Sequence, residues 1–71
     1  MQISRTEFNR FKAVPHHPAL RFGQAWFNYF TLQKHTPASD AERVMLDRIY
    51  NERDPSKAES LILANFTDPT N

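Results

Sequence analysis

The chain has 71 residues, of which 39% are hydrophobic and 24% charged, values typical of one small globular domain rather than of a disordered segment. Because it contains no cysteine, it can form neither a disulfide framework nor a thiolate metal site. Residues 1–5 lack the apolar core of a signal peptide, and the longest apolar run is residues 61–64. We therefore expect a soluble cytoplasmic protein that does not enter a membrane.

The charged residues are unevenly distributed along the chain, although the net charge is only +1. Residues 1–35 carry five basic side chains and one acidic one, a net charge of +4, whereas residues 36–71 carry four basic and seven acidic ones, a net charge of −3. All three histidines also lie in the basic half. Such a division indicates a polar partner surface, or else solvated helix faces of opposite charge.

A first helix is predicted over residues 5–14. Ser4 and Glu7 have the spacing of a capping box, in which each side chain binds the other residue's amide. Pro15 ends the helix because it has no amide hydrogen and restricts the residue before it. The predicted apolar face consists of Phe8, Phe11 and Val14, with Ile3 packing against it from outside the helix.

The central element is a helix predicted over residues 18–33, with Pro18 at its first position. At about 100° per residue, its apolar arc covers roughly two-thirds of the circumference and includes Phe22 and Trp26. Other helices should therefore pack on two of its sides. Gly23 costs about 1 kcal/mol in a helix relative to alanine. We expect the first or the last helix to approach its backbone closely there.

Two further helices are predicted in the second half of the chain. Thr36 before Pro37, and Ser39 with Glu42, are alternative starts for a helix that ends between residues 50 and 53. Its inner face is expected to be Ala41, Met45 and Ile49, with Val44 and Leu46 beside them. The Asp54-Pro55 pair starts a fourth helix to about residue 65, which should bury Ala58, Leu61, Ile62 and Phe66.

These elements predict an all-α fold, a small compact domain of about four short helices around a central aromatic-rich helix. The domain is expected to span residues 1–66, and residues 67–71 form a polar, flexible C-terminal tail.

The pattern of polar residues does not favour catalysis. Adjacent histidines such as His16 and His17 have diverging side chains, and His35 lies at the far end of the central helix. Zinc ligands on a helix would be three or four residues apart. The serines are explained as caps or helix-surface residues, and one glycine cannot form a phosphate-binding loop. We therefore expect no enzyme activity, no cofactor and no metal.

Binding to a partner is the function that remains, and three patches are candidates for it. The first is a basic flank on the first helix, formed by Arg5, Asn9 and Lys12. The second is the turn between two prolines, with His16 and His17. The third is a polar seam on the central helix, formed by Arg21, Gln24 and Asn28. Arginine and aromatic side chains often anchor such interfaces. For each patch, ordinary solvated residues are the alternative interpretation.

Basic residues also alternate with aromatic ones in the first half of the chain, as on surfaces that bind single-stranded nucleic acid. Phosphate contacts dominate such affinity, and a net charge of +1 supplies little of it. The aromatic residues also have the spacing of a helix core. We therefore expect contact with nucleic acid to be indirect, beside a larger protein that holds it.

The string from Leu20 to Asn28, LRFGQAWFN, followed by a helix that ends before Asp-Pro, resembles a pattern in small early proteins of tailed bacteriophages. In size and layout the chain is similar to the host-takeover regulators of Xanthomonas phages. The resemblance implies a cytoplasmic protein of the infected bacterium that binds RNA polymerase at the N-terminal region of the β′ subunit. It further implies inhibition of transcription initiation and suppression of termination. An inhibitor of another host enzyme or defence complex, and a direct DNA-binding protein, are the alternatives.

Overall fold

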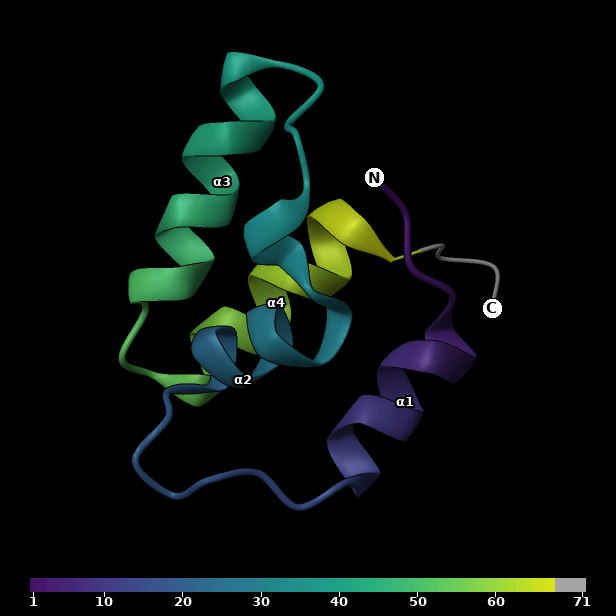
Figure 1. Ribbon diagram of the computed structural model, residues 1–71, viewed down its shortest axis with the longest axis vertical. Coiled ribbons are helices and arrows are strands. Elements are labelled where there is room, and N and C mark those ends of the chain that lie inside the picture. The colour runs from purple at the N-terminus through teal and green to yellow at the C-terminus, as the bar shows by residue number, and fades with distance from the viewer. Residues whose placement is uncertain (68–71) are drawn as a thin grey trace.

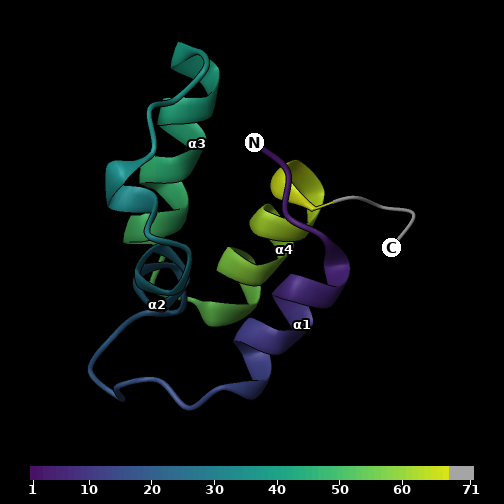
Figure 2. The same cartoon turned by 45° about the vertical axis from the view of Figure 1, so that its right-hand side comes forward.

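Helix α2 (Phe22–Phe30) lies in the middle of the domain, and it packs against α3 (Asp40–Asn51) and α4 (Pro55–Phe66). The computed structural model describes residues 1–67 and also contains α1 (Arg5–Ala13) and a short 3-10 helix, η1 (Leu32–Lys34). Figures 1 and 2 show α1 and α3 at opposite sides of the molecule, with α4 between them. No strand occurs in this part of the chain, so the predicted all-α fold of four helices is confirmed.

Three of the helices begin at predicted start signals, and of the two alternatives for α3 the structure has Ser39 rather than Thr36. The hydroxyls of Ser4 and Ser39 accept hydrogen bonds from the amides of the glutamates three residues later, at 3.0 and 3.1 Å. Asp54 Oδ1 accepts from the amides of residues 56 and 57, and Pro55 occupies the first position of α4. Each cap satisfies amides that have no partner within the helix.

The predicted bounds of the central helix were wrong at both ends. Residues 18–20 form a turn instead, in which the Leu20 amide donates to the His17 carbonyl and the His17 ring accepts from the Ala19 amide. These local bonds compete with a helical arrangement. Helix α2 then starts after Arg21 and ends at Thr31, whose left-handed backbone (φ 56°, ψ 42°) separates it from η1.

The core is built around aromatic rings. Trp26, Phe8 and Phe11 are fully buried together with Ile49 and Ile62, whereas Phe22 is only partly buried. Phe11 of α1 is surrounded by rings from α2, and Trp26 packs against Phe66 of α4 with 5.7 Å between ring centroids. The Trp26 indole nitrogen has no hydrogen-bond partner among residues 1–67. An unsatisfied buried donor costs about 1–3 kcal/mol.

The buried faces of the outer helices differ in part from the predicted ones. In α3, Leu46 and Ile49 are buried, but Ala41 is exposed and Met45 only partly buried. Val14, predicted to belong to the face of α1, is 42% exposed. The buried residues of α4 are three of the four predicted, namely Ala58, Ile62 and Phe66.

Gly23 allows the backbones of α2 and α3 to touch. A Cβ atom at this position would lie 2.0 Å from the carbonyl oxygen of Ile49 and 2.7 Å from its carbonyl carbon. The predicted close approach at Gly23 is thus present, but the neighbour is α3 and not the first or last helix. Because α3 meets α2 through its C-terminal half, Leu46 and Ile49 face the core, whereas Ala41, the second residue of α3, does not.

The two ends of the described chain lie side by side (Figure 1). The Ile3 amide donates to the Phe66 carbonyl at 2.7 Å, and Ile3 forms an isolated bridge with Thr67. Thr67 is 5% exposed and its hydroxyl donates to the Leu63 carbonyl. The structure thus places this first residue of the predicted tail against the domain, and residues 68–71 lie outside the described residues. Within residues 1–67, no helix has the length and hydrophobicity that crossing a membrane requires.

Replacing Gly23 by alanine should destabilise the domain by at least about 2 kcal/mol, since the clash with the Ile49 carbonyl exceeds the helix-propensity gain of about 1 kcal/mol. Urea denaturation followed by circular dichroism measures the change. The matched control is Ser60→Ala at an exposed position of α4, expected to change stability by about 0.5 kcal/mol or less. Equal stabilities for the G23A variant and the wild type would contradict the close contact.

Replacing Thr31 by glycine should stabilise the domain by about 0.5–1 kcal/mol, because a β-branched residue is strained in the left-handed region and glycine is not. Thermal denaturation of the T31G variant should show a higher midpoint. Thr6→Gly, inside α1, is the control and should lower the midpoint. A lower midpoint for T31G would contradict the strain at this position.

Candidate functional site

The predicted basic flank is partly occupied by an internal contact. Lys12 Nζ lies 2.7 Å from Glu59 Oε2 of α4 and 5.6 Å from the centre of the Phe8 ring. This ion pair joins α1 to α4, although an exposed pair contributes at most about 1 kcal/mol. Arg5 is partly buried, and Asn9 is exposed on the same helix. Lys12 therefore acts first as a tether between helices.

The predicted histidine turn belongs to residues 14–20, here called the 14–20 loop, which together with Arg21 join α1 to α2. His16 Nε2 lies 2.8 Å from the Phe11 carbonyl oxygen, to which the Nε2–H tautomer donates, and its ring packs on the Phe11 ring at 4.7 Å. His17 Nδ1 accepts from the Ala19 amide at 3.1 Å. Both histidines thus hold the loop in place.

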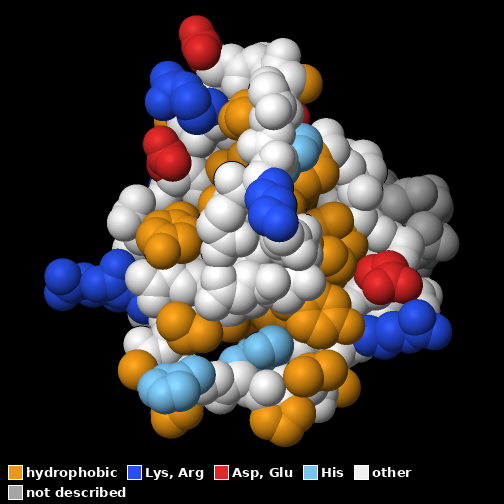
Figure 3. All heavy atoms as spheres, in the orientation of Figure 1, with side chains coloured by type: hydrophobic (Ala, Val, Ile, Leu, Met, Phe, Trp, Pro, Cys, Tyr) orange, Lys and Arg blue, Asp and Glu red, His pale blue; other side chains and the backbone are white. Residues whose placement is uncertain are grey.

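The 14–20 loop is also an apolar surface. Every one of its residues is exposed, and five of the seven are apolar: Val14, Pro15, Pro18, Ala19 and Leu20. Tyr29, 38% exposed, lies beside it with its ring 6.3 Å from that of His16. Figure 3 shows pale blue histidines among orange hydrophobic side chains at the lower end of the molecule, where Figure 1 places this loop.

The predicted polar seam on α2 serves its own helix. The Gln24 side-chain oxygen accepts from the Arg21 amide at 3.0 Å, which caps the helix. Asn28 Oδ1 accepts from the Gln33 side chain at 2.6 Å, across the junction with η1. Arg21 is partly buried. Of the three predicted patches, the histidine turn is the one that lies in a segment, the 14–20 loop, whose residues are all exposed and mostly apolar.

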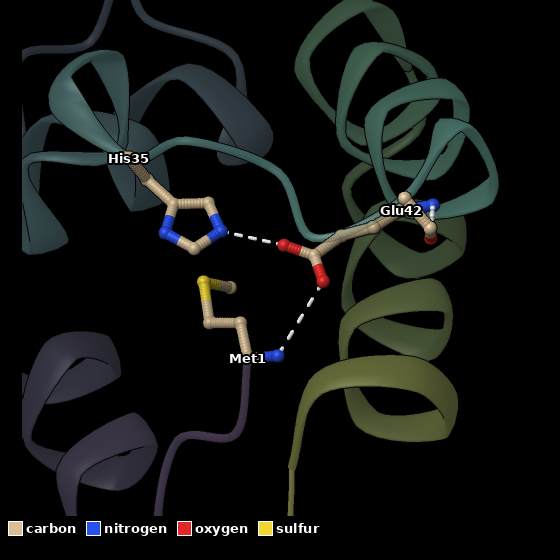
Figure 4. Close-up of polar contacts among 4 residues, drawn as sticks. Met1, His35 and Glu42 are labelled. Atoms are coloured by element: carbon tan, nitrogen blue, oxygen red, sulfur yellow. Dashed lines mark hydrogen bonds and ion pairs between the residues drawn. The ribbon is translucent and has the colours of Figure 1, made fainter.

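A polar cluster missed by the sequence analysis joins three distant segments. The Glu42 carboxylate, 11% exposed, binds His35 Nε2 at 2.5 Å through Oε1 and the Met1 amino group at 3.5 Å through Oε2 (Figure 4). The hydrogen bond with His35 lowers the pKa of Glu42; partial burial raises it, and the charge of the amino group adds to the lowering. The capping pattern predicted Glu42 as a local cap only, and no local signal marked its distant partners.

A second feature absent from the sequence predictions is an open groove of about 450 Å³ between α3 and α4. Arg48 of α3 and Glu52, the residue after the end of α3, line one side of the groove. The residues that line it from α4 are Ser56, Lys57, Ser60, Leu61 and Ala64. Most of its surface is apolar. Residues of two helices form it jointly, so it exists only in the packed domain.

Among the described residues, no three His, Asp or Glu side chains lie close enough together to hold a metal ion. No protein-family model, no curated protein and no solved structure matches the chain. The candidate sites therefore rest on geometry: the 14–20 loop, the Glu42 cluster and the α3–α4 groove.

The Glu42 cluster should make stability depend on pH. The pKa of Glu42 in the folded state is lowered from its usual value of 4.5, so the ionised carboxylate favours the folded state. This contribution to the free energy of unfolding is present above pH 4.5 and is lost as the pH falls through the lowered pKa. Glu42→Gln should therefore be less stable than the wild type at pH 7, and the difference should shrink at pH 3.

Urea denaturation at the two pH values checks this dependence. Asp47→Asn removes the same charge from an exposed face of α3 and should have the smaller effect at pH 7. An E42Q deficit of the same size at pH 3 and pH 7 would contradict a role for the Glu42 charge.

Proposed function

We propose that this protein is a small binding module that acts by occupying a site on a protein partner, with the 14–20 loop as its contact surface. The observation that carries the proposal is the apolar character of this exposed loop. Val14 and Leu20 are 42% and 36% exposed, respectively, and Tyr29 extends the surface from α2. Contiguous exposed apolar surface rimmed by polar residues is typical of protein–protein contacts.

The loop is well suited to binding because it loses little freedom when a partner covers it. Pro15 and Pro18 restrict its backbone, and the bonds of His16 and His17 hold its two halves. A surface that is already ordered has a lower entropic cost of association. In this proposal the histidines orient the apolar residues, and the partner contacts Val14, Leu20 and Tyr29 directly.

The proposed partner is bacterial RNA polymerase, at the N-terminal region of the β′ subunit. The choice rests on the resemblance of residues 20–28 to small phage proteins, and that string begins at Leu20 within the loop. Arg10 lies on α1 and Arg21 directly precedes α2, so both flank the loop, which suits a site near nucleic acid already held by a larger protein. Binding there would inhibit initiation at host promoters, with suppressed termination as a second consequence.

The direct test is binding of the purified chain to purified RNA polymerase core and holoenzyme, followed by promoter-dependent transcription in vitro. Pull-down from a bacterial lysate, with mass spectrometry, runs in parallel. Recovery of polymerase subunits and inhibition of initiation support the proposal. Stoichiometric recovery of a different enzyme or defence complex, without polymerase, overturns it and favours the first alternative. Salt-sensitive binding to DNA by the isolated chain favours direct DNA recognition.

Replacing Val14 or Leu20 by glutamate should weaken binding to polymerase about tenfold or more. Each variant loses the burial of one aliphatic side chain in the interface, which contributes about 1.5 kcal/mol or more. Biolayer interferometry measures the dissociation constants. The matched control is Val44→Glu, which changes a 55% exposed valine on α3 and should leave the affinity unchanged. Circular dichroism verifies that all three variants are folded. Equal affinities for V14E, L20E and V44E would exclude the loop as the contact surface.

A further inference from the structure

The α3–α4 groove combines an apolar wall with positive charge. Leu61 and Ala64 contribute apolar side chains, and Arg48 and Lys57 contribute cations from the two helices. Neither cation forms an ion pair with a described residue. No residue of the 14–20 loop lines the groove, so the two surfaces are separate.

The carboxylates at this end of the domain are directed to backbone amides instead of to the cations. Asp54 Oδ1 accepts from the amides of Ser56 and Lys57 at the start of α4. Glu52 Oε1 accepts from the Asp54 amide at 3.1 Å. Glu52 keeps its negative charge and lines the groove together with Arg48 and Lys57, so two cations and one carboxylate give the lining a net charge of +1. The charge of an occupant that complements the groove is therefore negative.

The shape of the groove favours a helix as occupant. Ser56, Ser60 and Ala64 are four residues apart on α4 and line the groove over about 12 Å, at 1.5 Å per residue. Small side chains along one ridge let a second helix approach closely. The groove is open to solvent, whereas a site for a small ligand encloses most of that ligand.

We propose that the α3–α4 groove binds an amphipathic helix of a protein partner, whose apolar side chains pack on Leu61 and Ala64 and whose carboxylates pair with Arg48 and Lys57. This mode of recognition places the apolar face of a helix in a groove, with charged residues at the rim. The inference goes beyond the proposed function, because it concerns a different surface and does not depend on RNA polymerase.

The test uses the full chain and a synthetic probe peptide. The probe is an amphipathic helix with leucine on one face and glutamate on both flanks of that face, labelled with fluorescein. A second peptide carries lysine in place of each glutamate, and a third has the probe's composition in an order without an apolar face. Fluorescence anisotropy at low salt should show saturable binding of the first peptide and none of the other two. Added salt should weaken it.

Three variants of the chain locate the binding. Lys57→Glu should weaken the probe about fivefold, as expected for loss of one exposed ion pair, and it leaves a carboxylate in the first turn of α4, where it favours the helix. Ser60→Phe fills the groove with a ring and should abolish binding. The matched control, Lys34→Glu, makes the same charge change at an exposed position of η1 and should leave binding nearly unchanged.

Equal binding of the glutamate and lysine peptides, or unchanged binding to the K57E and S60F variants, overturns the proposal. Light scattering that shows a dimer of the free chain, dissociated by S60F, assigns the groove to a second copy and also overturns it. Binding to vesicles with anionic headgroups, abolished by S60F and stronger than binding to the peptide, would identify a lipid surface and overturn it as well. Thermal denaturation verifies that each variant is folded.

Discussion

The contact between Gly23 of α2 and the Ile49 carbonyl of α3 determines how the helices of this domain pack. Without a side chain at Gly23, the two backbones can approach until the carbonyl occupies the space of a Cβ atom. This approach fixes the rotation of α3 about its axis, so that Leu46 and Ile49 face α2 while Val44 faces solvent. The outward face of α3 then forms one wall of the groove beside α4.

The aromatic cluster attaches α1 to this framework. Helix α2 packs on α3 and α4, whereas α1 is joined to the domain by the Phe8 and Phe11 rings, the Lys12–Glu59 ion pair and the Ile3 backbone bond. The Phe11 ring contacts three rings of α2 and the ring of His16. The 14–20 loop is therefore held at both ends by the same cluster, which makes the exposed apolar surface an ordered one.

Most of the polar residues that the sequence marked as candidate binding residues instead stabilise the fold. Lys12 joins two helices, His16 and His17 shape the loop, Gln24 caps α2, and Asn28 binds across the junction with η1. In a domain this small, nearly every polar side chain near a helix end lies within reach of an unpaired backbone amide or carbonyl. The apolar loop and the apolar groove are consequently better candidates for recognition than the polar patches.

Trp26 shows that the core is not optimal for stability. Its side chain is fully buried, yet the indole N–H has no partner within residues 1–67. The ring packs against Phe27, Phe30 and Phe66 instead. Burial of a large aromatic ring stabilises the fold by several kcal/mol, which outweighs the cost of about 1–3 kcal/mol for the unsatisfied donor. The packing of α2 against its neighbours therefore depends on the size of the Trp26 ring and not on its N–H group.

The sequence by itself determined the helix starts at Ser4 and Asp54, the burial of Trp26 and the all-α class, because caps and helical periodicity act within a few residues. For α3 it offered both Thr36 and Ser39 as starts, and the structure has Ser39. It did not determine where α2 begins and ends. The hydrogen bond of the Ala19 amide to the His17 ring and the left-handed backbone of Thr31 set these ends, and helix propensities predict neither. Only the tertiary structure decided that Gly23 meets α3, that Glu42 binds His35 and the Met1 amine, and that α3 and α4 enclose a groove. These features join residues far apart in the chain, and their geometry follows from how whole helices pack rather than from the order of residues within one of them.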